Sequence, residues 1–338
     1  MSDLIPTAKQ LHDFVDDLER CLNYEFGGKI DCDNIILCGM GGSAISGNVV
    51  ADYCMERSSK QIVAIMSPSL PKWISKRTLA IISGHSGNTL ETLEAYRQTL
   101  EIGCKRVVIT SGGYLEKIAK KNNDPIIMLP NNLHPRHSIG YMIGYIFGVI
   151  RATGCIGKQY DILGCIDPLR GYRDSLEDRE KGPAMALARQ FIGKIPVFCS
   201  RGNIQSIIFR WKTQFNENSK YVAFCTTPME LYHSDLRFWK EGNGSDYRLT
   251  MIVDRKGTAD DIMSKTIRHL DDEGVKYSVI SMDGDSEVEN MFRILMLGDY
   301  ISIYMAEIQG IDPSEVPPIA LLKTKLKPLI EERVKDLL

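Results

Sequence analysis

The sequence has no excess of charge of one sign and no long apolar run. Its 41 basic and 43 acidic side chains give a formal net charge of −2. Without a positive excess, the chain has no general attraction for nucleic acid, which binds proteins through its phosphates. The longest apolar runs, such as 145–150, are far shorter than the roughly 20 residues of a membrane-spanning helix. The first residues, MSDLIPTAKQ, show no basic segment followed by an apolar one. We therefore expect a cytoplasmic protein that binds neither nucleic acid nor membrane.

Metal-binding motifs are also missing. The nine cysteines contain no CxxC pair, and the six histidines contain no HxH or HExxH motif. His134 and His137 are the only close pair of histidines, and no neighbouring Cys or Glu completes a set of ligands. Several cysteines stand inside apolar strings, where cysteine behaves as a small apolar side chain. The sequence predicts reduced, buried thiols and neither a metal ion nor another cofactor.

Short apolar strings, most of them separated by helical lengths, run along the whole chain. Strings of four to six residues without polar alternation are typical of parallel strands that are buried on both faces. The length of 338 residues favours two domains of about 150 residues each. The predicted strands are 34–38, 61–66, 79–83, 106–110 and 125–129, followed by 194–200, 221–225, 248–253 and 276–281.

The fold class predicted from this pattern is α/β, with two αβα sandwiches built on parallel sheets and an additional C-terminal helix. We expect the domains to be 1–155 and 156–338. An apolar helix at 140–152 closes the first domain. A helix at 318–338 ends the second, with a kink or a break at Pro328.

A glycine-rich loop, GMGGSAISG at 39–47, follows the first predicted strand and opens a helix. Glycines let the backbone turn sharply and bring N–H groups against an anion, which a helix N-terminus also attracts. Ser43 adds a hydroxyl. Gly39, Gly41 and Ala44 fit the looser dinucleotide pattern GxGxxA, but no acidic residue ends the next strand to hold a ribose. The alternative is a tight turn without a ligand.

A second loop, SGHSGNTLET at 83–92, follows the third predicted strand. Ser86, Gly87 and Thr89 offer hydroxyls and amides. Loops at the carboxyl ends of nearby parallel strands can converge on one place above the sheet. Because the loops contain no Walker lysine and no clear Mg²⁺ carboxylate, they favour a monophosphate, such as that of a small sugar. An ordinary polar turn is the alternative.

Two residues are candidates for acid–base chemistry. Glu217 lies in the string RWKTQFNEN at 210–218, and at roughly 100° per residue it points about 140° away from the apolar stripe of its helix. Periodicity alone therefore predicts a solvated carboxylate. His233 follows sixteen residues later, in the polar and aromatic segment ELYHSD. Its imidazole can transfer a proton near neutral pH, although a single histidine is usually structural.

Two further basic residues stand out only through their position. Arg136 lies between Pro135 and His137 in the loop after the fifth predicted strand. Lys323 lies in the basic helix IALLKTKL. From the pattern alone, both fit solvated surface charges.

Five segments in this order resemble the bifunctional phosphoglucose/phosphomannose isomerase family: GMGGSAISG, SGNTLET, RWKTQFNEN, ELYHSDL and IALLKTKL. That family consists of two sugar-isomerase (SIS) domains, and the resemblance spans about 30–330. The specific part is RWKTQFNEN with a histidine sixteen residues beyond its glutamate. The two loops alone would indicate only an SIS domain.

The resemblance implies a role for each candidate. The implied phosphate-binding residues are Gly42, Ser43, Ser86, Gly87 and Thr89. Glu217 would move the proton between C1 and C2 of the sugar, and Arg136 would stabilise the enediolate. His233 would open the sugar ring of the neighbouring subunit in a homodimer with shared active sites. Lys323 matches the C-terminal lysine of the family's site.

The sequence departs from the family at two places. GHSGNT at 84–89 stands where the family usually has SYSGNT, so one phosphate-binding hydroxyl is missing. The triplet at 233–235 reads His-Ser-Asp where the family more often has His-Asn-Glu. The first change affects phosphate binding, and the second affects the orientation of His233.

The function implied is a metal-independent isomerisation of glucose 6-phosphate or mannose 6-phosphate to fructose 6-phosphate through a cis-enediolate. Two alternatives remain at this point. One is an SIS-type isomerase or deaminase of aminosugar phosphates. The other is a regulator that binds sugar phosphates without catalysis.

Overall fold

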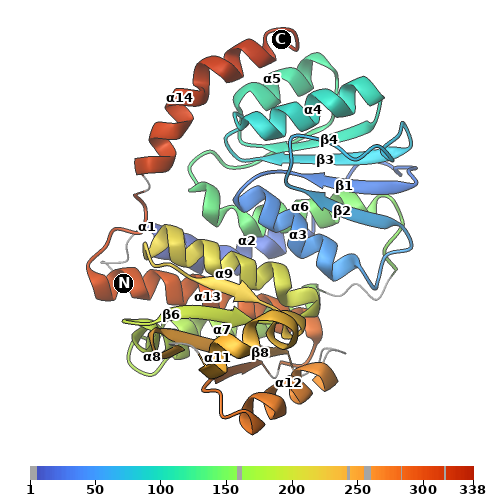
Figure 1. Ribbon diagram of the computed structural model, residues 1–338. Helices are drawn as coiled ribbons and strands as arrows, with labels where there is room; N and C mark the ends of the chain where they lie inside the picture. The colour runs from blue at the N-terminus through green and yellow to red at the C-terminus, as the bar shows by residue number, and fades with distance from the viewer. Residues whose placement is uncertain (1–5, 158–161, 242–243, 255–259, 283, 316) are drawn as a thin grey trace. The chain divides into compact units, whose positions relative to one another are not determined.

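The computed structural model contains two compact α/β units (Figure 1). It describes residues 6–157, 162–241, 244–254, 260–282, 284–315 and 317–338. The first unit consists of residues 13–163 and 316–338, and the second of residues 1–12 and 164–315. The predicted α/β class with parallel sheets is confirmed. None of the described helices is both long and apolar enough to cross a membrane.

The sheet of the first unit has five parallel strands in the order β2-β1-β3-β4-β5. The strands are β1 (Asn34–Cys38), β2 (Gln61–Ile65), β3 (Thr78–Gly84), β4 (Lys105–Thr110) and β5 (Ile126–Met128). β1 is an interior strand and pairs with both β2 and β3, so that Ile36 lies opposite Val63 and Ala80. All five strands correspond to the predicted ones, because continuous apolar strings fit a sheet covered on both faces.

Helices cover both faces of this sheet (Figure 1). One face carries α3 (Gly42–Cys54) and α6 (Ile139–Arg151), with α2 (Phe14–Leu22) packed on α6. The other face carries α4 (Leu90–Ile102) and α5 (Gly113–Lys121). Alternate residues of each strand point to opposite faces. Ile36, Ala80 and Ile82 accordingly share a core with Leu93 and Leu115 of α4 and α5.

The compact units differ from the predicted domains 1–155 and 156–338 at both ends of the chain. The last helix, α14 (Pro317–Val334), belongs to the first unit, because its Ile330 and Val334 are buried in the core cluster that α4 and α5 share and α14 packs against α4. It continues as one helix through Pro328, where the sequence predicted a kink or break. The first described helix, α1 (Pro6–His12), belongs to the second unit, where His12 Nδ1 lies 2.9 Å from Glu177 Oε1.

The sheet of the second unit has four parallel strands in the order β7-β6-β8-β9. They are β6 (Ile195–Cys199), β7 (Phe224–Thr226), β8 (Tyr247–Asp254) and β9 (Ser278–Met282). β7 begins later than predicted. The reason is that the Tyr221 amide donates to the Phe215 carbonyl oxygen at 3.0 Å and so continues the turn that follows a helix.

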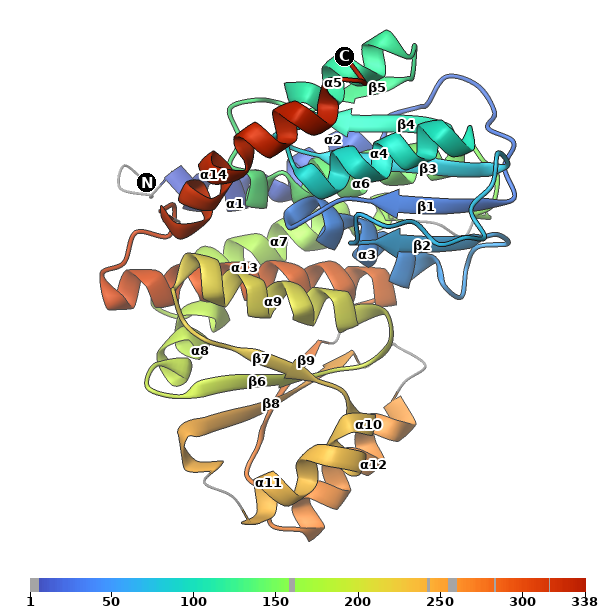
Figure 2. The ribbon, with the colours of Figure 1, turned by 45° about the horizontal axis from the view of Figure 1, so that its top comes forward.

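Helices also cover both faces of this second sheet (Figure 2). On one face lie α9 (Gln205–Asn218) and α13 (Glu287–Gln309), and α7 (Ile166–Glu177) and α8 (Pro183–Phe191) pack against α13. On the other face lie α10 (Pro228–Glu230), α11 (Leu236–Glu241) and α12 (Asp260–Asp272). The core on this face joins Val197 and Leu249 of the sheet to Leu231 and Met263.

Candidate active site

The two glycine-rich loops of the first unit leave adjacent strands. β1 and β3 are paired and parallel, so their carboxyl ends meet at the same edge of the sheet. In the strand order β2-β1-β3-β4, this is the point where the chain connections diverge to opposite sides. Open parallel sheets bind ligands in the crevice at such a point. The first unit therefore brings Ser43 and Ser86, one from each loop, to one edge.

The first loop ends where α3 begins. Gly41 precedes this helix with a φ of +58°, a conformation that favours glycine. Ser43, in the first turn of α3, is buried. A Cβ atom on Gly42 would lie 3.2 Å from the Pro135 carbonyl oxygen, so the segment that carries Arg136 packs directly against the start of α3.

The second loop leads into α4. Ser86 is exposed, and its Oγ accepts a hydrogen bond from the Asn88 amide at 3.3 Å. Thr89 is the residue before the first turn of α4. Gly87 has a φ of +63°, and a Cβ atom there would collide with the Gly112 carbonyl. This loop therefore requires glycine at position 87 for both its conformation and its packing.

A segment after β4, which the sequence did not single out, fixes this second loop. The amide and the Oγ of Ser111 both donate to the His85 carbonyl oxygen, at 3.0 and 2.6 Å. The Tyr114 amide donates to Asn88 Oδ1 at 2.9 Å. Ser-Gly-Gly directly after the apolar string at 106–110 was the signal that could have identified it.

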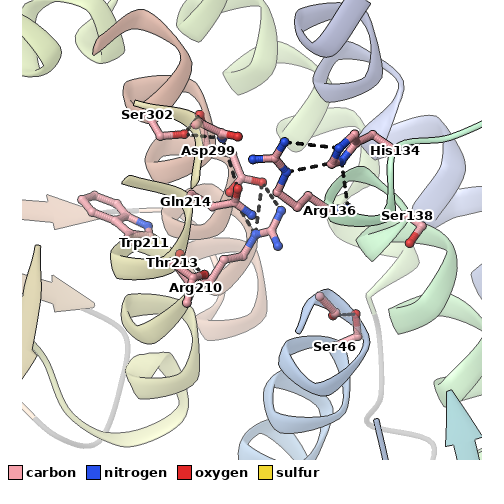
Figure 3. Close-up of polar contacts among 12 residues, drawn as sticks. Ser46, His134, Arg136, Ser138, Arg210, Trp211, Thr213, Gln214, Asp299 and Ser302 are labelled. Atoms are coloured by element: carbon pink, nitrogen blue, oxygen red, sulfur yellow. Dashed lines mark hydrogen bonds and ion pairs between the residues drawn. The ribbon is translucent and has the colours of Figure 1, made fainter. Parts of the chain in front are cut away.

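Arg136 is buried, with only 5% of its surface exposed, so it is not the surface charge that the sequence pattern allowed. It lies in the short 3₁₀ helix η1 (Pro135–His137) after β5. Its Nε lies 3.3 Å from His134 Nδ1, and its Nη2 lies 3.3 Å from His134 Nε2 (Figure 3). A neutral imidazole can accept from the guanidinium, so His134 helps to fix the direction of Arg136.

The surroundings of His134 keep it neutral. Burial, followed by the positive charges of Arg136, His85 and Lys323, lowers its pKa to about 4. Burial also lowers the pKa of His85, and Lys323 adds to that effect. Lys323 itself is exposed on α14. The first unit thus gathers Lys323, Arg136 and two histidines into one group with positive potential.

Glu217 lies in the last turn of α9 in the second unit and is partly buried. The sequence pattern predicted a solvated carboxylate, because that prediction rested only on the apolar stripe of this helix. α9 buries a second, polar stripe as well. Its members are spaced four residues apart: Arg210, Gln214 and Asn218, which are 1%, 3% and 0% exposed.

The polar stripe binds α13 (Figure 3). Arg210 Nε and Nη2 donate to the two carboxylate oxygens of Asp299 at 2.9 and 2.8 Å. Asn218 Nδ2 donates to Ser302 Oγ at 2.8 Å. Sequence reasoning missed these residues, although the spacing of Arg210, Gln214 and Asn218 within RWKTQFNEN was visible. The stripe explains why this string combines large apolar and polar residues.

His233 is exposed and lies on a π-helical turn, η4 (Leu231–Asp235). Such turns are rare and often occur at functional sites. Two of its residues replace the Asn-Glu that is more usual in the resembled family. Ser234 Oγ lies 3.1 Å from Asp235 Oδ1, and Asp235 Oδ2 accepts from Thr226 Oγ1 at 2.8 Å. Asp235 therefore connects the turn to β7.

The cysteines behave largely as predicted. Eight of the nine are buried, and Cys225 is exposed. Burial raises the pKa of the Cys38 thiol to about 12, which makes it a poor nucleophile. Within the described residues, no group of three His, Cys, Asp or Glu side chains could hold a metal ion.

Solved structures define the class of this fold. It is similar to tagatose-6-phosphate ketose/aldose isomerase from Escherichia coli, with a TM-score of 0.71 and 17% identity over 91% of this chain and 94% of that one. Residues 180–326 match the model of the bacterial phospho-glucose isomerase C-terminal SIS domain. Residues 180–326 are therefore similar to a sugar-isomerase (SIS) domain.

Sequence relatives define the family. The chain is 31% identical to the bifunctional phosphoglucose/phosphomannose isomerase of Caldicellulosiruptor bescii, over 90% of this chain and 94% of the relative. It is 30% identical to the enzyme of the same name from Aquifex aeolicus, over 87% of this chain and 90% of the relative. This protein belongs to the bifunctional phosphoglucose/phosphomannose isomerase family.

Proposed function

We propose that this protein interconverts glucose 6-phosphate and mannose 6-phosphate with fructose 6-phosphate. The observation that carries the proposal is sequence similarity. The chain is 31% and 30% identical, over 90% and 87% of its length, to relatives that are named for these two activities. The reaction needs an anion site, a base and a group that stabilises negative charge. Candidate residues for all three are present.

The sugar phosphate is assigned to the two loops of the first unit. The hydroxyls of Ser43, Ser86 and Thr89 and the amides of Gly42 and Gly87 would hold it. Support comes from the adjacent carboxyl ends of β1 and β3, and from the N-termini of α3 and α4, which attract anions. The positive charges of Lys323 and Arg136 favour the same anion.

Glu217 is assigned the proton transfer. Its carboxylate takes the proton from C2 of the open-chain aldose, the C–H electron pair forms the C1–C2 double bond, and the carbonyl electrons move to O1. The result is a cis-enediolate. Glu217 then returns the proton to C1 as the C1–C2 double bond opens, and the O2 proton passes to the O1 oxyanion as the C2 ketone forms, which leaves a hydroxyl at C1. A glutamate has a pKa of about 4.3 in water and is a weak base there, so this role requires a site that excludes water.

Arg136 is assigned to the enediolate, since a fixed guanidinium offsets the charge that develops on the oxygens. Its burial and its contacts with neutral His134 support this role, because a preorganised donor needs no rearrangement during the reaction. Lys323 is assigned to the same site. No step in this scheme requires a metal ion.

His233 is assigned to the opening of the sugar ring, in the site of the neighbouring subunit of a homodimer. Its exposure on a π-helical turn supports this assignment, since the side chain is accessible to another chain. Mixing inactive Glu217→Gln and His233→Gln proteins should restore part of the activity through hybrid dimers. If hybrids form and stay inactive, the site is not shared. We propose the cytoplasm as the location, as expected from the reduced cysteines.

The proposed function is tested by measuring fructose 6-phosphate formation from both aldose phosphates, with and without EDTA. We expect turnover of both and no effect of EDTA. Release of ammonia from glucosamine 6-phosphate, without isomerisation of the two aldoses, would instead indicate a deaminase. Binding of hexose phosphates without any turnover would indicate a regulator.

A further inference from the structure

The second unit contains a cavity of about 440 Å³ at the carboxyl ends of β6 and β7. We call it the β6–β7 pocket. Its lining includes Ser200, Gln205, Phe209, Phe224, Glu230 and Asp235. None of the residues assigned above to the isomerisation lines it. Its volume lies within the range of small-molecule sites.

Ser200, directly after β6, is the polar group at the bottom of this pocket. It is completely buried, and its Oγ has no hydrogen-bond partner among the described residues. A buried hydroxyl without a partner destabilises a fold, and most such groups are satisfied by the protein, by water or by a ligand. Because Ser200 lines this pocket, a ligand that its hydroxyl reaches through another side-chain rotamer can supply the missing partner.

Two carboxylates supply the charge of the pocket. Glu230 Oε2 accepts from Ser234 Oγ at 2.9 Å, and Asp235 Oδ2 accepts from Thr226 Oγ1 at 2.8 Å. Among the described residues, neither carboxylate forms an ion pair. An ionised carboxylate only accepts hydrogen bonds, and it repels anions. The pocket therefore selects a ligand with several donors or a positive charge, and it disfavours a phosphate.

Aromatic side chains line the same pocket. Phe209 of α9 and Phe224 of β7 contribute rings, and Phe224 is 49% exposed. Apolar rings cover the C–H faces of a ligand, while a few polar groups fix its orientation. The pocket thus offers carboxylate acceptors, one hydroxyl without a partner among the described residues, and aromatic rings. These groups match a small molecule that carries hydroxyls and an amine on a carbon ring.

We propose that the β6–β7 pocket binds an amine-bearing sugar without a phosphate group. Its ammonium would lie near Glu230 and Asp235, and one of its oxygens would bond to Ser200. The pocket contains none of the residues assigned to the isomerisation, although its Asp235 lies on the same turn as His233, and the proposal does not depend on the isomerase function. The protein would then bind two kinds of ligand, an anionic sugar phosphate at the isomerase site and a cationic amine-bearing sugar in the β6–β7 pocket.

The test is calorimetric titration of the full-length protein with glucosamine, in an equilibrated mixture of hexose 6-phosphates that occupies the isomerase site. We expect saturable binding at one site. Ser200→Ala should weaken it about tenfold, on the scale of one hydrogen bond, without lowering Tm, because the variant removes an unsatisfied hydroxyl. Asp235→Asn should weaken glucosamine binding but leave glucose binding unchanged.

Ser219→Ala is the matched control. Ser219 is also completely buried, but its Oγ donates to the Phe215 carbonyl oxygen at 2.8 Å, so the variant should lower Tm and leave glucosamine binding unchanged. Absence of glucosamine binding, or binding that Ser200→Ala does not weaken, would overturn the proposal. So would equally tight binding of glucose, or tighter binding of glucosamine 6-phosphate.

Discussion

The two sheets share one strand order but differ in the connection that leaves their first strand. In β2-β1-β3-β4 and in β7-β6-β8-β9, the strand that comes first in the chain is an interior strand, the second lies on one side of it, and the third and fourth lie on the other side. After β1, a glycine-rich turn leads directly into α3. After β6, the 3₁₀ turn Gly202–Ile204 comes before α9. The same topology therefore provides two edges, and the loop residues determine which ligand each edge can take.

The helices that follow these turns also differ, in the size and charge of the side chains that they bury. α3 buries small residues such as Ala44 and Gly47, and a Cβ atom on Gly47 would lie 3.1 Å from Leu37 Cβ. α9 buries Trp211, Phe215 and an ion pair. The first unit offers the backbone amides that we propose for the phosphate, whereas the second holds a helix with a large buried core face that carries Glu217. We expect changes in the first unit to affect KM and changes in the second to affect kcat or folding.

The largest effect expected is on the stability of the second unit. Arg210→Met leaves Asp299 as a buried carboxylate without its bidentate partner, which should lower the free energy of unfolding by about 3–5 kcal/mol. Urea unfolding measures this. In the control, Arg237→Met removes an exposed ion pair with Glu241 and should change stability by about 0.5 kcal/mol or less. Equal effects of both variants would show that the polar stripe is not a structural element of α9.

Glu217→Gln should reduce kcat by about 10² or more for both aldose phosphates, because the amide cannot take up the proton. KM should change little, since the proposed phosphate site lies in the first unit. Steady-state kinetics measures both constants. Glu273→Gln, which removes a partly buried partner of the exposed Lys240, should retain full activity. A Glu217→Gln enzyme with normal kcat would remove the assigned base.

Ser86→Ala combined with Thr89→Val should raise KM about tenfold, because two hydroxyls of the proposed phosphate site are lost. kcat should stay within a factor of a few. The matched control is Ser69→Ala, an exposed serine outside both loops, for which KM should equal that of the wild type. An unchanged KM in the double variant would place the phosphate elsewhere.

The smallest effect concerns acid stability of the first unit. The folded pKa of His134 is about 4, below its ordinary value of 6.5. As the pH falls through 6.5 the unfolded chain binds a proton that the folded chain does not, so stability present above pH 6.5 is lost at lower pH. His134→Gln keeps an acceptor for Arg136 but cannot titrate. Between pH 6.5 and 5, the free energy of unfolding measured in urea should fall by about 1 kcal/mol less in the His134→Gln variant than in the wild type. Parallel profiles would contradict the depressed pKa.

The strands were the most predictable part of the fold, because an uninterrupted apolar string has few other stable environments. The two loops were also visible, since glycine at 41 and 87 serves a backbone conformation that the sequence can indicate. In contrast, the burial of Arg136 depends on how a short loop packs against α3, which no local pattern encodes. The polar stripe of α9 was missed for a related reason. Its partners, Asp299 and Ser302, lie more than 80 positions away in the chain.

The position of α14 has a practical consequence for dividing this protein into parts. A fragment that stops after residue 163 retains every strand of its sheet but loses Ile330 and Val334 from the layer over α4 and α5. The remaining apolar surface would face water. Expression of such a half should therefore yield an aggregation-prone product, and supplying residues 316–338 as a separate peptide should restore its solubility.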